Sequence, residues 1–174
     1  MQIRLTRLTN DRHRLEVLRD DGSRESRELE TRSALVHDLV HYAVESEAGL
    51  RASFYGRLAS GTTYEALMTE PPDGPEALQT EAVVARLQGI ASRDAWPAEM
   101  RGFADFIAAG FRALAQEPPA WLTDDLLERV RERLRRVQGQ WRATPFHHTL
   151  ALEFPARVSS ARDAAALERG GGVR

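Results

Sequence analysis

RLEVLRDDGSRESRELE, residues 14–30, places a tight turn between two segments that have the pattern of β-strands. Leu15 and Val17 stand two positions apart, as residues on one face of a half-buried strand do. The DDG sequence at 20–22 favours a hairpin, because Asp-Gly readily adopts the positive φ angles of a tight turn. The polar segment 24–30 then predicts a further strand, and its weak alternation predicts that this strand lies at a sheet edge.

The segments on either side extend this sheet. QIRLTRL at 2–8 alternates Ile3 and Leu5 with polar residues, which predicts a first strand and therefore an N-terminal antiparallel meander. PFHHTLALEFP predicts a last strand, from Phe146 to Phe154, that pairs with the meander. We therefore expect an α+β fold in which a small antiparallel sheet, the N-terminal meander plus the C-terminal strand, packs against about five helices.

The residues between these strands have helical periodicity. A helix is predicted from Ser33, as its N-cap, to about Ala48, with Gly49 as its C-cap. Short helices are expected on both sides of GTT at 61–63, followed by a Pro- and Gly-rich loop at 69–75. Single apolar stripes predict three longer helices, at 76–93, 97–116 and 123–142.

Length and composition set the domain organisation. The chain has 174 residues, and we expect one globular domain over 1–158 and a flexible C-terminal tail over 159–174, where small side chains and glycines gather. Its N-terminus lacks the apolar core of a signal peptide, and its apolar runs fall short of the roughly 18 residues that cross a membrane. We expect a cytoplasmic protein without membrane contact.

Two absent residue types exclude several chemistries. The chain has no cysteine, and all 24 basic residues are arginine. A thiolate nucleophile, an iron–sulfur cluster, a lysine Schiff base and a phosphate-loop lysine are therefore excluded. A net charge of −2 gives no overall attraction to nucleic acid, and Glu128 and Glu132 interleave with the arginines of 129–142. That segment is interpreted as a solvated helix face, so nucleic acid is not an expected partner.

HDLVHYAVE at 37–45 is the candidate functional motif. On a helix with about 100° per residue, His37, His41, Glu45 and Asp38 form one narrow polar stripe, and the rest of the helix surface is mostly apolar. Such a helix is expected to be buried on most sides, with its stripe facing a cleft or an ion. Two imidazoles at i and i+4 can both reach one divalent metal ion, which could be zinc.

This motif predicts a divalent-metal-binding protein that could act as a hydrolase. His37 and His41 are the predicted metal ligands. Asp38 and Glu45 are the candidate catalytic residues, which could serve as general base, orient a ring or supply a third ligand. His147 and His148 are further candidates for a third ligand, although only one of two adjacent strand residues can face inward.

The alternative is a non-enzymatic interaction module, or a homo-oligomeric structural protein, in which the His/Asp/Glu stripe only stabilises its helix. The partner is then an unknown protein rather than a small molecule. Phe103, Phe106 and Phe111 lie on one predicted helix and could leave apolar area for a homodimer.

The same motif carries two resemblances. HDLVHYAVE, followed by GL at 49–50 and FYGRLASG at 54–61, resembles a family of uncharacterised bacterial proteins in which an HDLxHY helix follows a small sheet. The shorter HDxxH is similar to the zinc motif of a scaffold family in coenzyme Q biosynthesis and to the HExxH motif of zinc proteases, with Asp38 in place of Glu. These resemblances imply that the positions to examine for a functional role are His37, Asp38, His41 and Tyr55.

Overall fold

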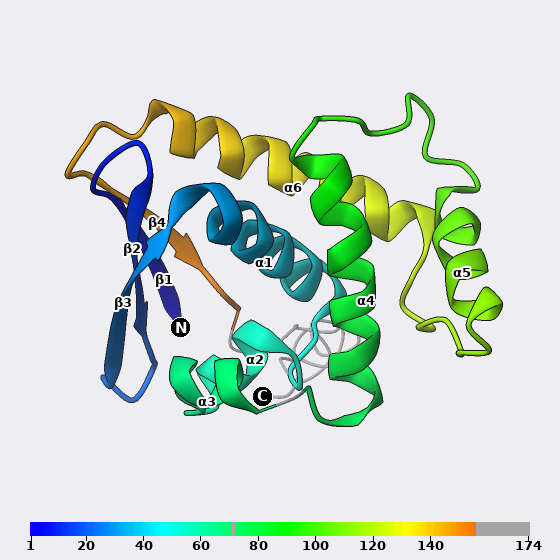
Figure 1. Ribbon diagram of the computed structural model, residues 1–174, viewed down its shortest axis with the longest axis horizontal. Coiled ribbons are helices and arrows are strands. Elements are labelled where there is room, and N and C mark those ends of the chain that lie inside the picture. The colour runs from blue at the N-terminus through cyan, green and yellow to red at the C-terminus, as the bar shows by residue number, and fades with distance from the viewer. Residues whose placement is uncertain (71, 156–174) are drawn as a thin grey trace, which may run out of the picture.

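The computed structural model describes residues 1–70 and 72–155. The sheet lies at one side of the molecule, and the helices pack beside it (Figure 1). The predicted tail at 159–174 and the predicted domain end at 158 lie outside the described residues. Among the described residues, no helix combines the length and the apolar character that crossing a bilayer requires.

The sheet has four antiparallel strands in the order β3-β2-β1-β4. They are β1 (Gln2–Arg7), β2 (Arg12–Leu18), β3 (Arg24–Glu30) and β4 (Thr149–Glu153). Ile3 lies opposite Val17 on one side and Leu152 on the other, and all three side chains are buried. The meander, the pairing of the C-terminal strand with it and the edge position of the polar strand are confirmed.

The predicted hairpin is present between β2 and β3. Gly22 has a φ of 84°, and its N–H donates to the carbonyl of Arg19. A left-handed backbone costs glycine little, so this residue supplies the conformation that closes the turn.

The helix that carries the motif is α1 (Val36–Ala48), and it follows β3 without a capped start. A π-helical turn, η1 (Thr31–Leu35), leads directly into it, so the prediction of Ser33 as N-cap is wrong. The Ser33 hydroxyl instead donates to the Glu30 carboxylate. Gly49 ends the helix as predicted, with a φ of 71° and its N–H bonded to the Glu45 carbonyl.

Helix α1 lies at the centre of the molecule (Figure 1). It packs against α4 (Gly74–Ala91) and α6 (Asp124–Ala143), and every residue from 38 to 46 is buried. Glu47, at the end of α1, accepts hydrogen bonds from Arg129 and Arg133 of α6. Two arginines of the predicted solvated face therefore join α6 to α1.

The remaining helices differ from prediction mainly at their ends. The short helices around GTT are α2 (Phe54–Ala59) and α3 (Tyr64–Thr69). Helix α5 (Phe103–Ala113) is shorter than the predicted 97–116, because Gly102 has a φ of 77° and the Asp124 carboxylate accepts the N–H groups of Gly102 and Ala104. Helix α4 begins at Gly74, inside the predicted loop, since Pro75 is tolerated in a first helical turn. Strand β4 starts three residues later than predicted, at Thr149.

Candidate metal centre

Three side chains from two packed helices converge beside α1. His37 and His41 come from α1 and Glu81 from α4, and one ligand atom from each lies within 4.8 Å of the others. His41 Nε2 is 3.3 Å from Glu81 Oε1, and His37 Nε2 is 4.0 Å from Glu81 Oε2. The structure therefore contains a group that could hold a metal ion, and the two predicted ligands belong to it.

The helical spacing of the two histidines brings their rings together. The ring centroids of His37 and His41 are 4.5 Å apart, as expected for i and i+4 positions on one helix face. Phe54, at the start of α2, packs against both rings, with centroid distances of 6.4 Å to His37 and 5.2 Å to His41. This apolar wall limits the space into which either imidazole can turn.

Glu81 reaches the histidines because α4 is tied to the loop that follows α1. Glu76, in the first turn of α4, accepts the backbone N–H groups of Arg51 and Ala52 through one carboxylate oxygen. Glu81 lies next to the buried stripe of α4 and is partly exposed, with 39% of its side chain accessible. Its carboxylate can therefore face the histidines and solvent at once.

Each histidine has its Nδ1 atom paired with a buried carboxylate of α1. His37 Nδ1 is 3.2 Å from Asp38 Oδ1, and His41 Nδ1 is 2.9 Å from Glu45 Oε1. The other oxygen of Glu45 accepts the N–H of Gly56 at 3.0 Å. A carboxylate on Nδ1 favours the tautomer with hydrogen on Nδ1, which leaves the Nε2 lone pair free. In both rings Nε2 is the atom on the side of Glu81.

The Nε2 atom of His41 is buried and makes no hydrogen bond within the part of the chain that the structure describes, although Glu81 Oε1 lies 3.3 Å away. The contact between this nitrogen and the Glu81 carboxylate is therefore close enough for an ion pair but lacks the geometry of a well-formed hydrogen bond. Burial lowers the pKa of His41, but Glu45 and Glu81 outweigh it and raise the pKa to about 9. Burial raises the pKa of Glu81, and His41 outweighs it, so that this pKa is lowered.

Asp38 and Tyr55 lie on the inner side of the site. Asp38 is 2% exposed, and its Oδ2 atom is buried without a hydrogen-bond partner in residues 1–70 and 72–155. Tyr55 is buried among aromatic rings, with its centroid 4.9 Å from that of Phe54 and 5.8 Å from that of Phe154. Burial, followed by the charges of Asp38 and Glu45, raises the pKa of Tyr55 well above its usual value. Its phenol therefore stays protonated at neutral pH.

This donor set suits a divalent cation. Two imidazole nitrogens and one carboxylate oxygen form a common zinc ligand set, in which neighbouring donors around a tetrahedral ion are about 3.4 Å apart. His41 Nε2 is already near this separation from Glu81 Oε1, whereas His37 Nε2, 4.0 Å from Glu81 Oε2, would have to move closer to share a tetrahedral ion. The Nε2 atom of His41 is the feature that a metal ion would fit best, because this buried nitrogen makes no hydrogen bond to the described residues although Glu81 Oε1 lies 3.3 Å away.

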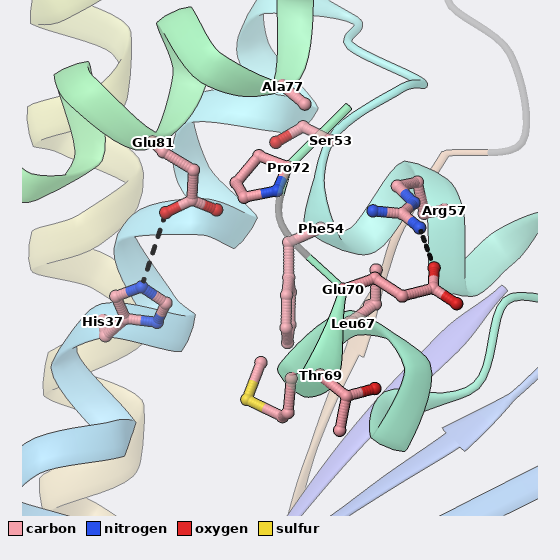
Figure 2. Close-up of a pocket in the computed structure, with 11 residues that line it drawn as sticks. His37, Ser53, Phe54, Arg57, Leu67, Thr69, Glu70, Pro72, Ala77 and Glu81 are labelled. Atoms are coloured by element: carbon pink, nitrogen blue, oxygen red, sulfur yellow. Dashed lines mark hydrogen bonds and ion pairs between the residues drawn. The ribbon is translucent and has the colours of Figure 1, made fainter. Parts of the chain in front are cut away.

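A cavity of about 600 Å³ opens beside the group, and His37 and Glu81 form part of its wall (Figure 2). Its other walls come from α2, α3 and the start of α4. The lining residues are Ser53, Phe54, Arg57, Leu67, Met68, Thr69, Glu70, Pro72 and Ala77, together with His37 and Glu81. This volume is in the range of small-molecule sites.

The structure separates the candidates that the sequence grouped together. His147 and His148 are exposed and precede β4, where the N–H of His147 bonds to the carbonyl of Arg7, and neither belongs to the group around Glu81. Glu81 was not predicted. The available signal was an acidic residue beside the buried stripe of the helix that contains Val83, Val84 and Leu87.

The comparisons with known proteins do not name a relative: no family model, no curated protein and no solved structure gives a significant match.

Proposed function

We propose that this protein binds a divalent metal ion, preferably zinc, through His37, His41 and Glu81. The observation that carries this proposal is the shared arrangement of the two imidazoles. Each has Nδ1 on a buried carboxylate, and each has Nε2 on the side of Glu81. Carboxylate–histidine pairs of this kind orient metal ligands and increase their basicity.

The competing explanation is a buried ion pair in which protonated His41 bridges Glu45 and Glu81. A pKa of about 9 for His41 is compatible with this state in the metal-free protein. However, such a bridge would gain from a hydrogen bond at each nitrogen, and Nε2 makes none. The partly exposed His37 would not take part in this ion pair, whereas both imidazoles could bind a metal ion.

The cavity supports a hydrolytic role for the bound ion. Three protein ligands leave a coordination position for water, and a zinc ion in such a site lowers the pKa of bound water to about 7. Asp38 and Glu45 are buried on the far side of the imidazoles, and neither lines the cavity. We assign them the role of orienting the rings, and we assign contact with water and substrate to the cavity-lining Glu81.

Elemental analysis of protein purified without an affinity tag tests the proposal. We expect close to one zinc, iron or manganese per chain in the wild type and little metal in Glu81→Gln, which removes a ligand without removing volume. Glu70→Gln is the matched control, because Glu70 is an exposed carboxylate of the same cavity outside the group. It should retain the metal.

A thermal measurement gives an independent readout. Zinc at about 100 times its Kd stabilises the folded state by about 2.7 kcal/mol, which raises the Tm of a domain of this size by roughly 5–10 °C. We expect this shift in the wild type and in Glu70→Gln only. If the wild type contains no metal, and no divalent ion raises its Tm, the metal proposal is wrong and the group is an ion pair within the core.

A further inference from the structure

Arg57 lies at the end of the cavity away from His37, and Ser53 lies between Arg57 and Glu81, so these two side chains add a second polar region (Figure 2). Both belong to α2 or its N-cap, and Arg57 follows Phe54 by three residues, so the two share one side of the helix. Because Phe54 packs on the histidine rings, it lies between the candidate metal centre and Arg57. The cavity therefore runs from one polar end to another along an aromatic ring.

The Arg57 guanidinium is only loosely held. Its side chain is 21% exposed, and it pairs with Glu70 at 3.3 Å, while the Glu70 side chain is 62% exposed. Exposed pairs of this geometry contribute little stability, so an anion inside the cavity could compete with Glu70 for the guanidinium. The planar fork of arginine matches a carboxylate particularly well.

Ser53 provides an independent sign of a ligand. It is 2% exposed, and its hydroxyl has no hydrogen-bond partner among the described residues. Serine at an N-cap usually accepts a backbone N–H of the first turn, but Ser53 makes no such bond in α2. Ser53 lines the cavity, and because its Oγ atom is buried, a ligand atom can take this hydrogen bond once the hydroxyl turns toward the cavity.

The walls between these polar groups are mostly apolar. Phe54, Leu67, Met68, Pro72 and Ala77 supply them. An apolar enclosure with a few placed polar groups is the usual design of a small-molecule site.

We propose that the cavity binds a small carboxylic acid with an apolar body. The carboxylate pairs with Arg57, the body lies against Phe54, and a polar atom in the middle of the molecule bonds to the Ser53 hydroxyl. The part of the ligand farthest from the carboxylate then lies at His37 and Glu81. The inference that this acid is the substrate rests on the proposed function. Binding of the acid to the cavity does not require a metal.

Binding to the metal-free protein tests this inference separately from the metal. The probes are hippurate and 3-phenylpropanoate, each compared with its neutral primary amide, by isothermal titration calorimetry. We expect both acids to bind and both amides to bind at least tenfold more weakly, because the neutral amide cannot form the charge-assisted hydrogen bonds that the carboxylate makes with Arg57.

Three variants localise the interaction. Arg57→Gln should lower the affinity for the acids about tenfold or more, because it removes the charge-assisted hydrogen bond, and should leave the affinity for the amides unchanged. Glu70→Gln should raise the affinity for the acids severalfold, because it removes the carboxylate that competes for Arg57. A purely structural role of the Arg57–Glu70 pair would not produce this gain in affinity. Arg27→Gln, which breaks the exposed Arg27–Glu65 pair outside the cavity, should change nothing.

The outcomes are distinct from those of the metal experiment. Failure of the acids to bind, equal affinity for acids and amides, or an unchanged affinity in Arg57→Gln would overturn the assignment of the cavity, even if zinc binds. Binding of the acids through Arg57 would support it, even in a protein that takes no metal.

Discussion

Replacing Glu45 by Gln should separate the orientation of His41 from the stability of the fold. Glu45 is fully buried and accepts two hydrogen bonds, from His41 Nδ1 at 2.9 Å and from the N–H of Gly56 at 3.0 Å. A glutamine amide has only one oxygen. If that oxygen keeps the Gly56 N–H, the amide nitrogen faces His41 Nδ1, which must then become an acceptor.

In the neutral ring, this change favours the tautomer with hydrogen on Nε2, the proposed metal-binding atom. The Nε2–H group would face Glu81 Oε1, 3.3 Å away, which reduces the cost to the metal-free fold. Zinc at Nε2 requires the remaining ring proton to stay on Nδ1, where it would face the amide N–H₂ group and not a carboxylate. The zinc affinity should therefore fall by about 10–100-fold, the usual cost of losing a carboxylate behind a histidine ligand, equivalent to about 1.4–2.7 kcal/mol.

Two measurements on wild type and Glu45→Gln decide the matter. Zinc affinity is obtained by competition with a chromophoric chelator, and the free energy of unfolding of the metal-free forms is obtained by urea denaturation. The reasoning would be refuted by a zinc affinity within threefold of wild type. If His41 and Glu45 form only a buried ion pair, the variant should instead lose about 1.5–3 kcal/mol of stability.

Other predictions concern pH and backbone space. In the metal-free protein, the pKa of His41 is raised from an ordinary 6.5 to about 9. The stability that this shift adds is fully present below pH 6.5 and is lost as the pH rises to 9. Urea denaturation over this pH range should show the loss in the wild type and not in His41→Ala. Over the same range zinc affinity should rise about tenfold per pH unit, because one proton leaves His41 on binding; a flat profile in chelator competition would contradict this. Gly56→Ala should lower the free energy of unfolding, measured by urea denaturation, by about 1–3 kcal/mol or more, because its Cβ would overlap the Arg51 backbone. Gly139→Ala, which has open space around it in α6, should raise the free energy of unfolding by about 0.5–1 kcal/mol.

The sheet could be predicted because its determinants are local in the sequence. Leu15 and Val17 alternate with polar residues, and Gly22 provides the φ that the hairpin needs. The burial of α1 could also be predicted, since its apolar residues surround the helix and leave only a narrow polar stripe. Both inferences depend on periodicity within one element, which a single sequence contains.

The helix ends were less predictable, because contacts from distant residues decide them. The start of α5 depends on Asp124, which belongs to α6 and accepts the N–H groups of Gly102 and Ala104. Ser33 has the residue type of an N-cap, but a π-helical turn carries the chain through it. A local preference of about 1 kcal/mol for a cap is easily outweighed by such tertiary interactions.

The third member of the candidate site shows the same limit more sharply. His37 and His41 could be paired from sequence because one helix fixes their spacing. Glu81 could not be added to them, since its place depends on how α4 packs against α1, and that packing is set in part by Glu76 binding the loop at Arg51 and Ala52. The polar stripe of α1 also contains two kinds of group that its periodicity does not distinguish. Nε2 of each histidine lies on the side of Glu81, while Asp38 and Glu45 are buried behind the rings, so the direction of each side chain, rather than its place on the helix, separates candidate ligands from the groups that orient them.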